Sequence, residues 1–144
     1  MSPYTAKIKR VRHYENKQKE NQMEYSDSLK KNNEFQRVYR KGTSQANRYL
    51  VMYVLENHDR HMENRLGISV SKKVGNSVVR HRVTRLIRES YRLNERSFRQ
   101  GLDIVVVARP NAKDRTYQEI ESAFLHLARK HHITGNEHDK EISD

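Results

Sequence analysis

The stretch from Ser71 to Arg99 holds nine basic residues and only two acidic ones, so it is the part of the chain best suited to bind a polyanion. Within this stretch, arginine supplies every strong positive charge after the Gly75-Asn76 turn. A planar guanidinium can bind phosphate through two parallel hydrogen bonds and can stack on bases, which favours contact with nucleic acid. The basic residues are Lys72, Lys73, Arg80, Arg82, Arg85, Arg88, Arg92, Arg96 and Arg99.

A helix through this stretch separates the arginines from the apolar residues. At about 100° per residue the two groups lie about 150° apart around the helix axis, and Asn76 or Ser77 is available as the N-cap. The helix therefore has one face for a core and one for a polyanion. The arginine side would hold Arg85, Arg88, Arg92, Arg96 and Arg99 with Arg82 at its border, and the apolar side would hold Val79, Val83, Leu86, Ile87 and Leu93.

The alternative is a solvated face held by ion pairs. Such a face mixes both signs and places Glu four residues before Lys or Arg, whereas Glu89 is followed at that spacing by Leu93. Like charges at helical spacing repel each other, and a bound anion would compensate them. We therefore favour phosphate binding over solvation for this face.

A second group of residues has the chemistry to contact unpaired bases. A short amphipathic helix is predicted over 32–41, and a strand over 47–55 follows it. Stacking of a base on an aromatic ring contributes about 1–3 kcal/mol. Core packing between helix and sheet is an equal alternative from the pattern alone, but several tyrosine hydroxyls favour a groove at the surface. The residues are Phe35, Tyr39, Tyr49 and Tyr53.

The residue pattern gives no support to catalysis by the protein itself. His58 and His61 form an H-x-x-H pair and His131 and His132 are adjacent, but no third ligand lies at metal-binding spacing and the chain has no cysteine. The sequence also lacks phosphate-binding glycine loops and nucleophile motifs. We expect no catalytic residue, no metal site and no cofactor bound by the protein.

Composition sets the expected domain plan. A chain of 144 residues with net charge +11 and 34% hydrophobic residues predicts one domain of about 100 residues with polar ends. We expect a disordered arm over 1–27, a folded domain over 28–133 and a disordered tail over 134–144. No apolar run is long enough to span a membrane, and the lack of cysteine and of a secretory signal suits a cytoplasmic protein.

The order of predicted elements indicates an α+β fold with one small sheet covered by helices. The strand over 65–71 is expected to pair antiparallel with the strand over 47–55. A strand, the arginine helix and a further strand over 102–108 should form a parallel crossover. The last predicted element is a helix that begins after a capping box at Thr116 and ends near His131.

Residues 69–89, Ser-Val-Ser-Lys-Lys-Val-Gly-Asn-Ser-Val-Val-Arg-His-Arg-Val-Thr-Arg-Leu-Ile-Arg-Glu, resemble the signature of the bacterial ribonuclease P protein component. The segments 33–42, 46–48 and 103–109 are also similar to that family, and the likeness covers about residues 28 to 133. It implies a four-stranded α-β-β-β-α-β-α sandwich with an additional strand around 43–46. The resemblance also implies a left-handed crossover around the arginine helix, against the general rule.

In function, the resemblance implies an accessory protein of a ribozyme. The RNA subunit would hold the Mg²⁺ ions and hydrolyse the bond that joins the 5′ leader to precursor tRNA, without a protein nucleophile or base. The partners would be the catalytic RNA and precursor tRNA, with no membrane and no obligate protein partner. The residues for the catalytic RNA would be Lys72, Lys73, Asn76, Arg80, His81, Arg82, Arg85, Arg88 and Arg92, and those for the leader Phe35, Tyr39, Tyr49, Val51 and Tyr53.

Two positions depart from the family pattern. His81 stands where the family usually has Asn, and Thr84 where Lys is common. Because His81 projects onto the basic face, we hypothesise a slightly pH-dependent affinity for RNA. Two other classes stay open at this stage: a structural RNA-binding protein such as a ribosomal protein, which needs no leader groove, and a metal-dependent nuclease that acts alone.

Overall fold

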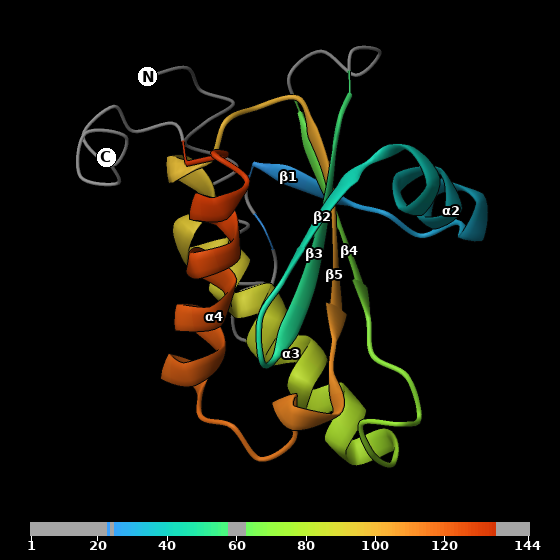
Figure 1. Cartoon of the computed structure of the whole chain (residues 1–144), viewed down its shortest axis with the longest axis vertical. Coiled ribbons are helices and arrows are strands. Elements are labelled where there is room, and N and C mark those ends of the chain that lie inside the picture. Colours follow the sequence, from blue (N-terminus) through green and yellow to red (C-terminus); the bar gives the residue numbers. More distant parts are fainter. Residues whose placement is uncertain (1–22, 24, 58–62, 135–144) are drawn as a thin grey trace, which may run out of the picture.

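The computed structural model describes residue 23, residues 25–57 and residues 63–134. The pair His58 and His61, most of the predicted arm and nearly all of the predicted tail lie outside the described residues. Within them, three α-helices cover a five-stranded sheet (Figure 1). The helices are α2 (Asn32–Lys41), α3 (Ser77–Asn94) and α4 (Tyr117–Lys130), and η1 (Glu95–Ser97) and η2 (Pro110–Ala112) are short 3-10 helices. The strands are β1 (Ser26–Ser28), β2 (Thr43–Ala46), β3 (Leu50–Glu56), β4 (Asn64–Ser69) and β5 (Leu102–Ala108).

Strand β5 occupies the centre of the sheet, whose order is β1-β4-β5-β3-β2. Its continuous apolar run is paired at both edges, in parallel with β4 and antiparallel with β3. The predicted parallel crossover through α3 is therefore confirmed, and its hand stays an expectation from the resemblance. The predicted direct pairing of β3 with β4 is wrong, because β5 lies between them.

Strand β1 is predicted neither by the sequence pattern nor by the resemblance. Its residues pair in parallel with the start of β4 at one edge of the sheet. The backbone N–H of Tyr25 donates to Glu95 at 3.2 Å, and the hydroxyls of Ser26 and Tyr91 are hydrogen-bonded at 2.6 Å. Strand β1 therefore begins within the segment assigned to the arm, and the sheet has five strands rather than four. At the other edge, β2 confirms the strand implied by the resemblance.

The helices lie on both faces of the sheet, with α3 and α4 on one and α2 on the other (Figure 1). The main core fills the α3–α4 side and includes Ile87, Phe124 and Ile104, none of which is exposed. A smaller cluster under α2 centres on Val38 and Val105. The sheet is thus a scaffold that carries α2 and α3 on opposite faces.

Local sequence accounts for the ends of these helices. Helix α2 has the predicted bounds, and Gly42 donates its N–H to the carbonyl of Val38 at 2.8 Å at its end. Thr116 and Glu119 form the predicted capping box at the start of α4. No helix in the described part of the chain is long and apolar enough to cross a membrane.

Candidate nucleic-acid interface

The N-terminal half of α3 presents its polar side to solvent. The side-chain oxygen of Asn76 accepts a hydrogen bond from the backbone N–H of Val79 at 3.0 Å, which confirms the predicted N-cap. This bond engages that oxygen in the helix cap, and the amide nitrogen of Asn76 keeps its two N–H donors for a phosphate. The basic residues exposed on this helix or in the loop before it are Lys72, Lys73, His81, Arg82 and Arg85, and Arg88 is half-buried.

The opposite side of α3 anchors the helix to the sheet. Val83 and Ile87 are fully buried in the main core, as the predicted helix requires. Leu93 is 56% exposed, and its predicted place on the apolar side is wrong. It follows Ile87 by six residues, so it lies about 120° around the axis from that core position. Tyr91, four residues after Ile87, is fully buried instead and holds the end of α3 in the main core.

Arg80 lies between the two sides of α3. Its side chain is half-buried, whereas His81 and Arg82 are exposed. Its Nε is buried and has no hydrogen-bond partner among the described residues. Arg80 is therefore less accessible to a ligand than the two residues that follow it.

The arginine stripe is shorter than predicted, because α3 ends at Asn94. Arg96 lies beyond the helix and places its guanidinium 4.9 Å from the centroid of the Tyr25 ring. Arg99, which precedes β5, forms an ion pair at 3.8 Å with Glu56 at the end of β3. Neither residue extends the basic face of α3.

Arg92 is the last arginine on the basic face of α3, and its charge is partly neutralised. It forms an ion pair with Glu89, three residues earlier, and both side chains are half-buried. The sequence places no basic residue four positions after Glu89, but a spacing of three residues also brings helix side chains together, and Arg92 stands at that spacing. The strongest positive face of α3 therefore lies between His81 and Arg88.

Three aromatic rings meet where α2 packs on β3. The centroids of Tyr39 and Tyr53 are 4.9 Å apart, edge to face, and Phe35 lies 6.4 Å from Tyr39. Val51 precedes Tyr53 by two residues on β3 and so points to the same face of the sheet. All four side chains are half-buried. We call these four residues the aromatic face.

A glycine in β4 makes room for the aromatic face. A Cβ on Gly67 would lie 2.7 Å from Cζ of Phe35, so the ring sits directly on the strand backbone. Burial raises the pKa of Tyr39, and a hydrogen bond with Ser69 opposes that shift only in part. The hydroxyl of Tyr39 therefore stays neutral near pH 7.

Tyr49 does not join the aromatic face, contrary to the prediction. It packs against the main core on the other side of the sheet, and the guanidinium of Arg115 lies 5.0 Å from its ring centroid. The cause is local: the side-chain oxygen of Asn47 accepts hydrogen bonds from the N–H groups of Tyr49 and Leu50, at 3.2 and 3.0 Å. This turn keeps Tyr49 out of the alternation of β3, which begins at Leu50.

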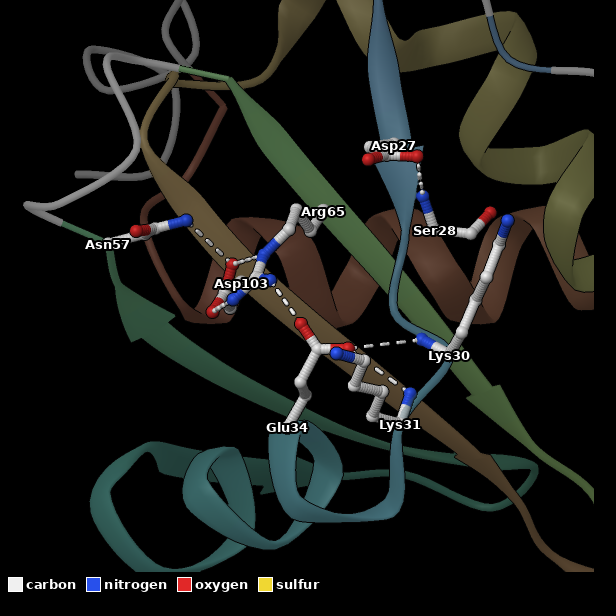
Figure 2. Close-up of polar contacts among 8 residues, drawn as sticks. All are labelled: Asp27, Ser28, Lys30, Lys31, Glu34, Asn57, Arg65 and Asp103. Atoms are coloured by element: carbon white, nitrogen blue, oxygen red, sulfur yellow. Dashed lines mark hydrogen bonds and ion pairs between the residues drawn. The ribbon is translucent and has the colours of Figure 1, made fainter.

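A buried network of charges ties α2 to the sheet, and the sequence pattern did not identify it. Figure 2 shows Arg65 of β4 between Asp103 of β5 and Glu34 of α2. Its Nε and Nη2 donate to the two oxygens of Asp103 at 2.9 and 2.7 Å, and its Nη1 donates to Glu34. Asn57 adds a hydrogen bond to Asp103 at 2.9 Å.

The charges of this network support each other. Hydrogen bonds with Asp103 raise the pKa of Arg65 against the effect of burial. Burial would raise the pKa of Glu34, but the N–H groups of Lys31 and Lys30 and the Arg65 guanidinium together hold it below its usual value. Arg65 thus fixes the first turn of α2, which carries Phe35. A charged residue in a strand with apolar neighbours is the one signal in the sequence for such a pair.

The described residues do not assemble a metal centre. No group of three His, Cys, Asp or Glu side chains in this part of the chain could hold a metal ion. Nε2 of His131 is hydrogen-bonded to the carbonyl of Met52 at 2.8 Å, and His132 is exposed. The side chain of His131 therefore makes a structural contact, and that of His132 faces solvent. The arrangement as a whole can bind an anionic polymer and stack bases.

Comparisons with known proteins agree with this chemistry. The family model described as Ribonuclease P matches residues 23–132. The chain belongs to the ribonuclease P protein family. It is 61% identical to the ribonuclease P protein component of Lachnoclostridium phytofermentans over 108 residues, which cover 75% of this chain and 91% of the relative. It is 56% identical to that of Alkaliphilus metalliredigens, with 75% and 96% covered.

Solved structures of ribonuclease P proteins share the fold. The protein from Staphylococcus aureus, solved at 2.0 Å, is 40% identical with a TM-score of 0.69, and the match covers 76% of this chain and 98% of that one. The protein from Thermotoga maritima is 28% identical with a TM-score of 0.65, over 72% and 96%. Membership of the ribonuclease P protein family implies a subunit of the holoenzyme, partnered by its RNA, with a role in maturation of the tRNA 5′ end.

Proposed function

We propose that the chain binds the catalytic RNA of ribonuclease P through α3 and contacts the 5′ leader of precursor tRNA through the aromatic face. It thereby promotes removal of the leader, while the RNA subunit carries out the hydrolysis. The observation that carries this proposal is the division of α3 into a buried apolar side and an exposed basic side, in a chain of this family.

Charge neutralisation is the proposed contribution of α3. Exposed His81, Arg82 and Arg85 offer forked or planar donors to phosphates, and Lys72 and Lys73 extend the same charge into the preceding loop. Engagement of about six to nine phosphates would give a slope of log affinity against log salt of about −4 to −8. Protein cations of this kind reduce the magnesium that the RNA needs to stay folded.

Leader recognition is the proposed role of the aromatic face. Its rings are half-buried rather than enclosed, so part of each is accessible to an unpaired base. The network around Arg65 fixes α2 on the sheet and so holds Phe35 and Tyr39 opposite Tyr53. Bases of a single-stranded leader could then stack on these rings. Mature tRNA lacks the leader and so cannot make these contacts.

Mg²⁺ would supply its chemistry from sites on the RNA. The protein side chains of this proposal are arginines, lysines, one histidine, tyrosines, phenylalanine and valine, whereas Mg²⁺ prefers carboxylate, phosphate and water oxygens. Their task is to bind and orient RNA, without a nucleophile or general base from the protein.

Reconstitution tests the proposal. The full chain is added to the cognate catalytic RNA at low Mg²⁺, and cleavage of precursor tRNA is measured against RNA alone and chain alone. We expect cleavage to rise only in the combined reaction. No gain would point to a purely structural RNA-binding protein, and cleavage by the chain alone that a chelator abolishes would point to a nuclease.

A further inference from the structure

A second set of basic residues lies beside the start of α3, outside the surfaces described so far. Three of its members belong to the connection between β5 and α4, and one belongs to the β2–β3 hairpin. The four residues, which we call the loop patch, are Arg48, Arg109, Lys113 and Arg115; all are exposed except Arg115, which is half-buried. In Figure 1 this connection runs past the start of α3 at the lower end of the molecule.

A hydrogen bond joins the loop patch to α3. Nη2 of Arg82 on α3 donates to the backbone carbonyl of Arg115 at 2.9 Å. Arg82 belongs to the exposed basic face of α3, so the two basic surfaces meet at this contact. A polyanion bound along α3 could therefore contact the loop patch directly, because basic residues of the two surfaces are adjacent at Arg82 and Arg115.

Two guanidinium groups of the loop patch, those of Arg109 and Arg115, are held in place. Arg115 donates from Nε to the carbonyl of Asn111 at 3.0 Å and lies over the ring of Tyr49. Arg109 donates from Nη1 to the carbonyl of Asn47 at 2.9 Å. Each guanidinium has five N–H donors, so most are left for a ligand. Fixed side chains lose little conformational entropy when a ligand binds.

Acidic residues nearby only partly offset these charges. Glu119 forms an ion pair with Arg115 at 3.6 Å, and it also caps α4 by accepting from the N–H of Thr116 at 3.1 Å. Asp114 is exposed and adopts a left-handed backbone conformation with φ of 64°. With Arg48 and the adjoining Arg82 included, positive side chains outnumber these carboxylates.

We propose that the loop patch binds phosphates of the catalytic RNA and forms a second contact beside α3. This inference rests on the proposed function, because it takes the RNA on α3 to be the catalytic RNA. The continuity through Arg82 favours that RNA over the leader, since the aromatic face lies on the other face of the sheet. Tyr49 acts here as a support that positions Arg115.

The test compares two variants of equal charge change in the full chain. Arg109→Ala with Lys113→Ala removes two cations of the loop patch. Arg129→Ala with Lys130→Ala removes two exposed cations from the last turn of α4 and serves as the control. Affinity for the catalytic RNA is measured over a range of salt concentrations, and thermal unfolding checks the fold. Lys113→Ala alone covers the case in which loss of Arg109 disturbs the hairpin.

In the loop-patch variant, the slope of log affinity against log salt concentration should become less steep by about two. Its affinity in 0.1 M salt should fall roughly 25- to 60-fold. The control should keep the wild-type slope. Lys113→Ala should lower the steepness by about one. Equal slopes for loop-patch and control variants would overturn the inference. An unchanged slope with catalytic RNA but weaker binding of precursor tRNA would also overturn it. Failure of the wild-type chain to bind catalytic RNA would instead reject the proposed function.

Discussion

Replacement of Arg65 by methionine should destabilise the fold more than a surface change can. Asp103 is 1% exposed, and Arg65 provides two of its hydrogen bonds, at 2.9 and 2.7 Å. Arg65→Met leaves that carboxylate buried with Asn57 as its remaining donor in Figure 2. Removing one partner of a buried ion pair costs about 3–5 kcal/mol of unfolding free energy. For a domain of this size we expect the melting temperature to fall by roughly 15–25 °C.

Thermal and urea unfolding followed by circular dichroism measure this effect. Arg129→Met is the matched control, because Arg129 is exposed on α4 and should change stability by at most about 0.5 kcal/mol. The double variant Arg65→Met with Asp103→Leu removes both charges and should recover most of the lost stability. A loss below about 1 kcal/mol for Arg65→Met, or a double variant no more stable than the single one, would refute the role assigned to the network.

Three further outcomes follow from single contacts. Asn76→Ala removes the cap of α3 and should cost about 1 kcal/mol in urea unfolding, whereas Asn76→Ser should cost much less. Gly67→Ala should displace the Phe35 ring and lower stability by about 1–3 kcal/mol, and an unchanged melting temperature would contradict the close approach. Burial lowers the pKa of His131 from its usual 6.5, so the folded state binds this proton less readily than the unfolded chain. Stability should therefore fall as pH drops below about 6.5, and His131→Gln should reduce that fall in melts at pH 5.5 and 7.5.

Helices were the most predictable part of this fold. The apolar spacing of α2 and the capping box of α4 are local signals, and the structure confirms both elements. Strand pairing was less predictable, because it depends on contacts between distant segments. The short polar strand β1 carries no pattern of its own, and its pairing with β4 becomes visible only in the assembled sheet.

The candidate site was predictable where it follows helix geometry. The exposed places of His81, Arg82 and Arg85 agree with the helical wheel. The wheel does not fix where a helix ends, and so Arg96 and Arg99 were wrongly included in the stripe. Tyr49 was misplaced because a turn at Asn47 interrupts the alternation of the strand.

According to the proposed function, α3 binds the catalytic RNA and the aromatic face binds the leader. Two affinities, measured on the same variants, test this separation most directly. In the reconstituted holoenzyme, binding of precursor and mature tRNA is measured together with binding of the chain to catalytic RNA. Tyr53→Ala should lower the preference for precursor roughly 5- to 150-fold, from about 1–3 kcal/mol per stacked base, and leave binding to catalytic RNA unchanged. Arg85→Ala with Arg88→Ala should weaken binding to catalytic RNA and keep the preference for precursor. Equal losses in both measurements for both variants would contradict the claim.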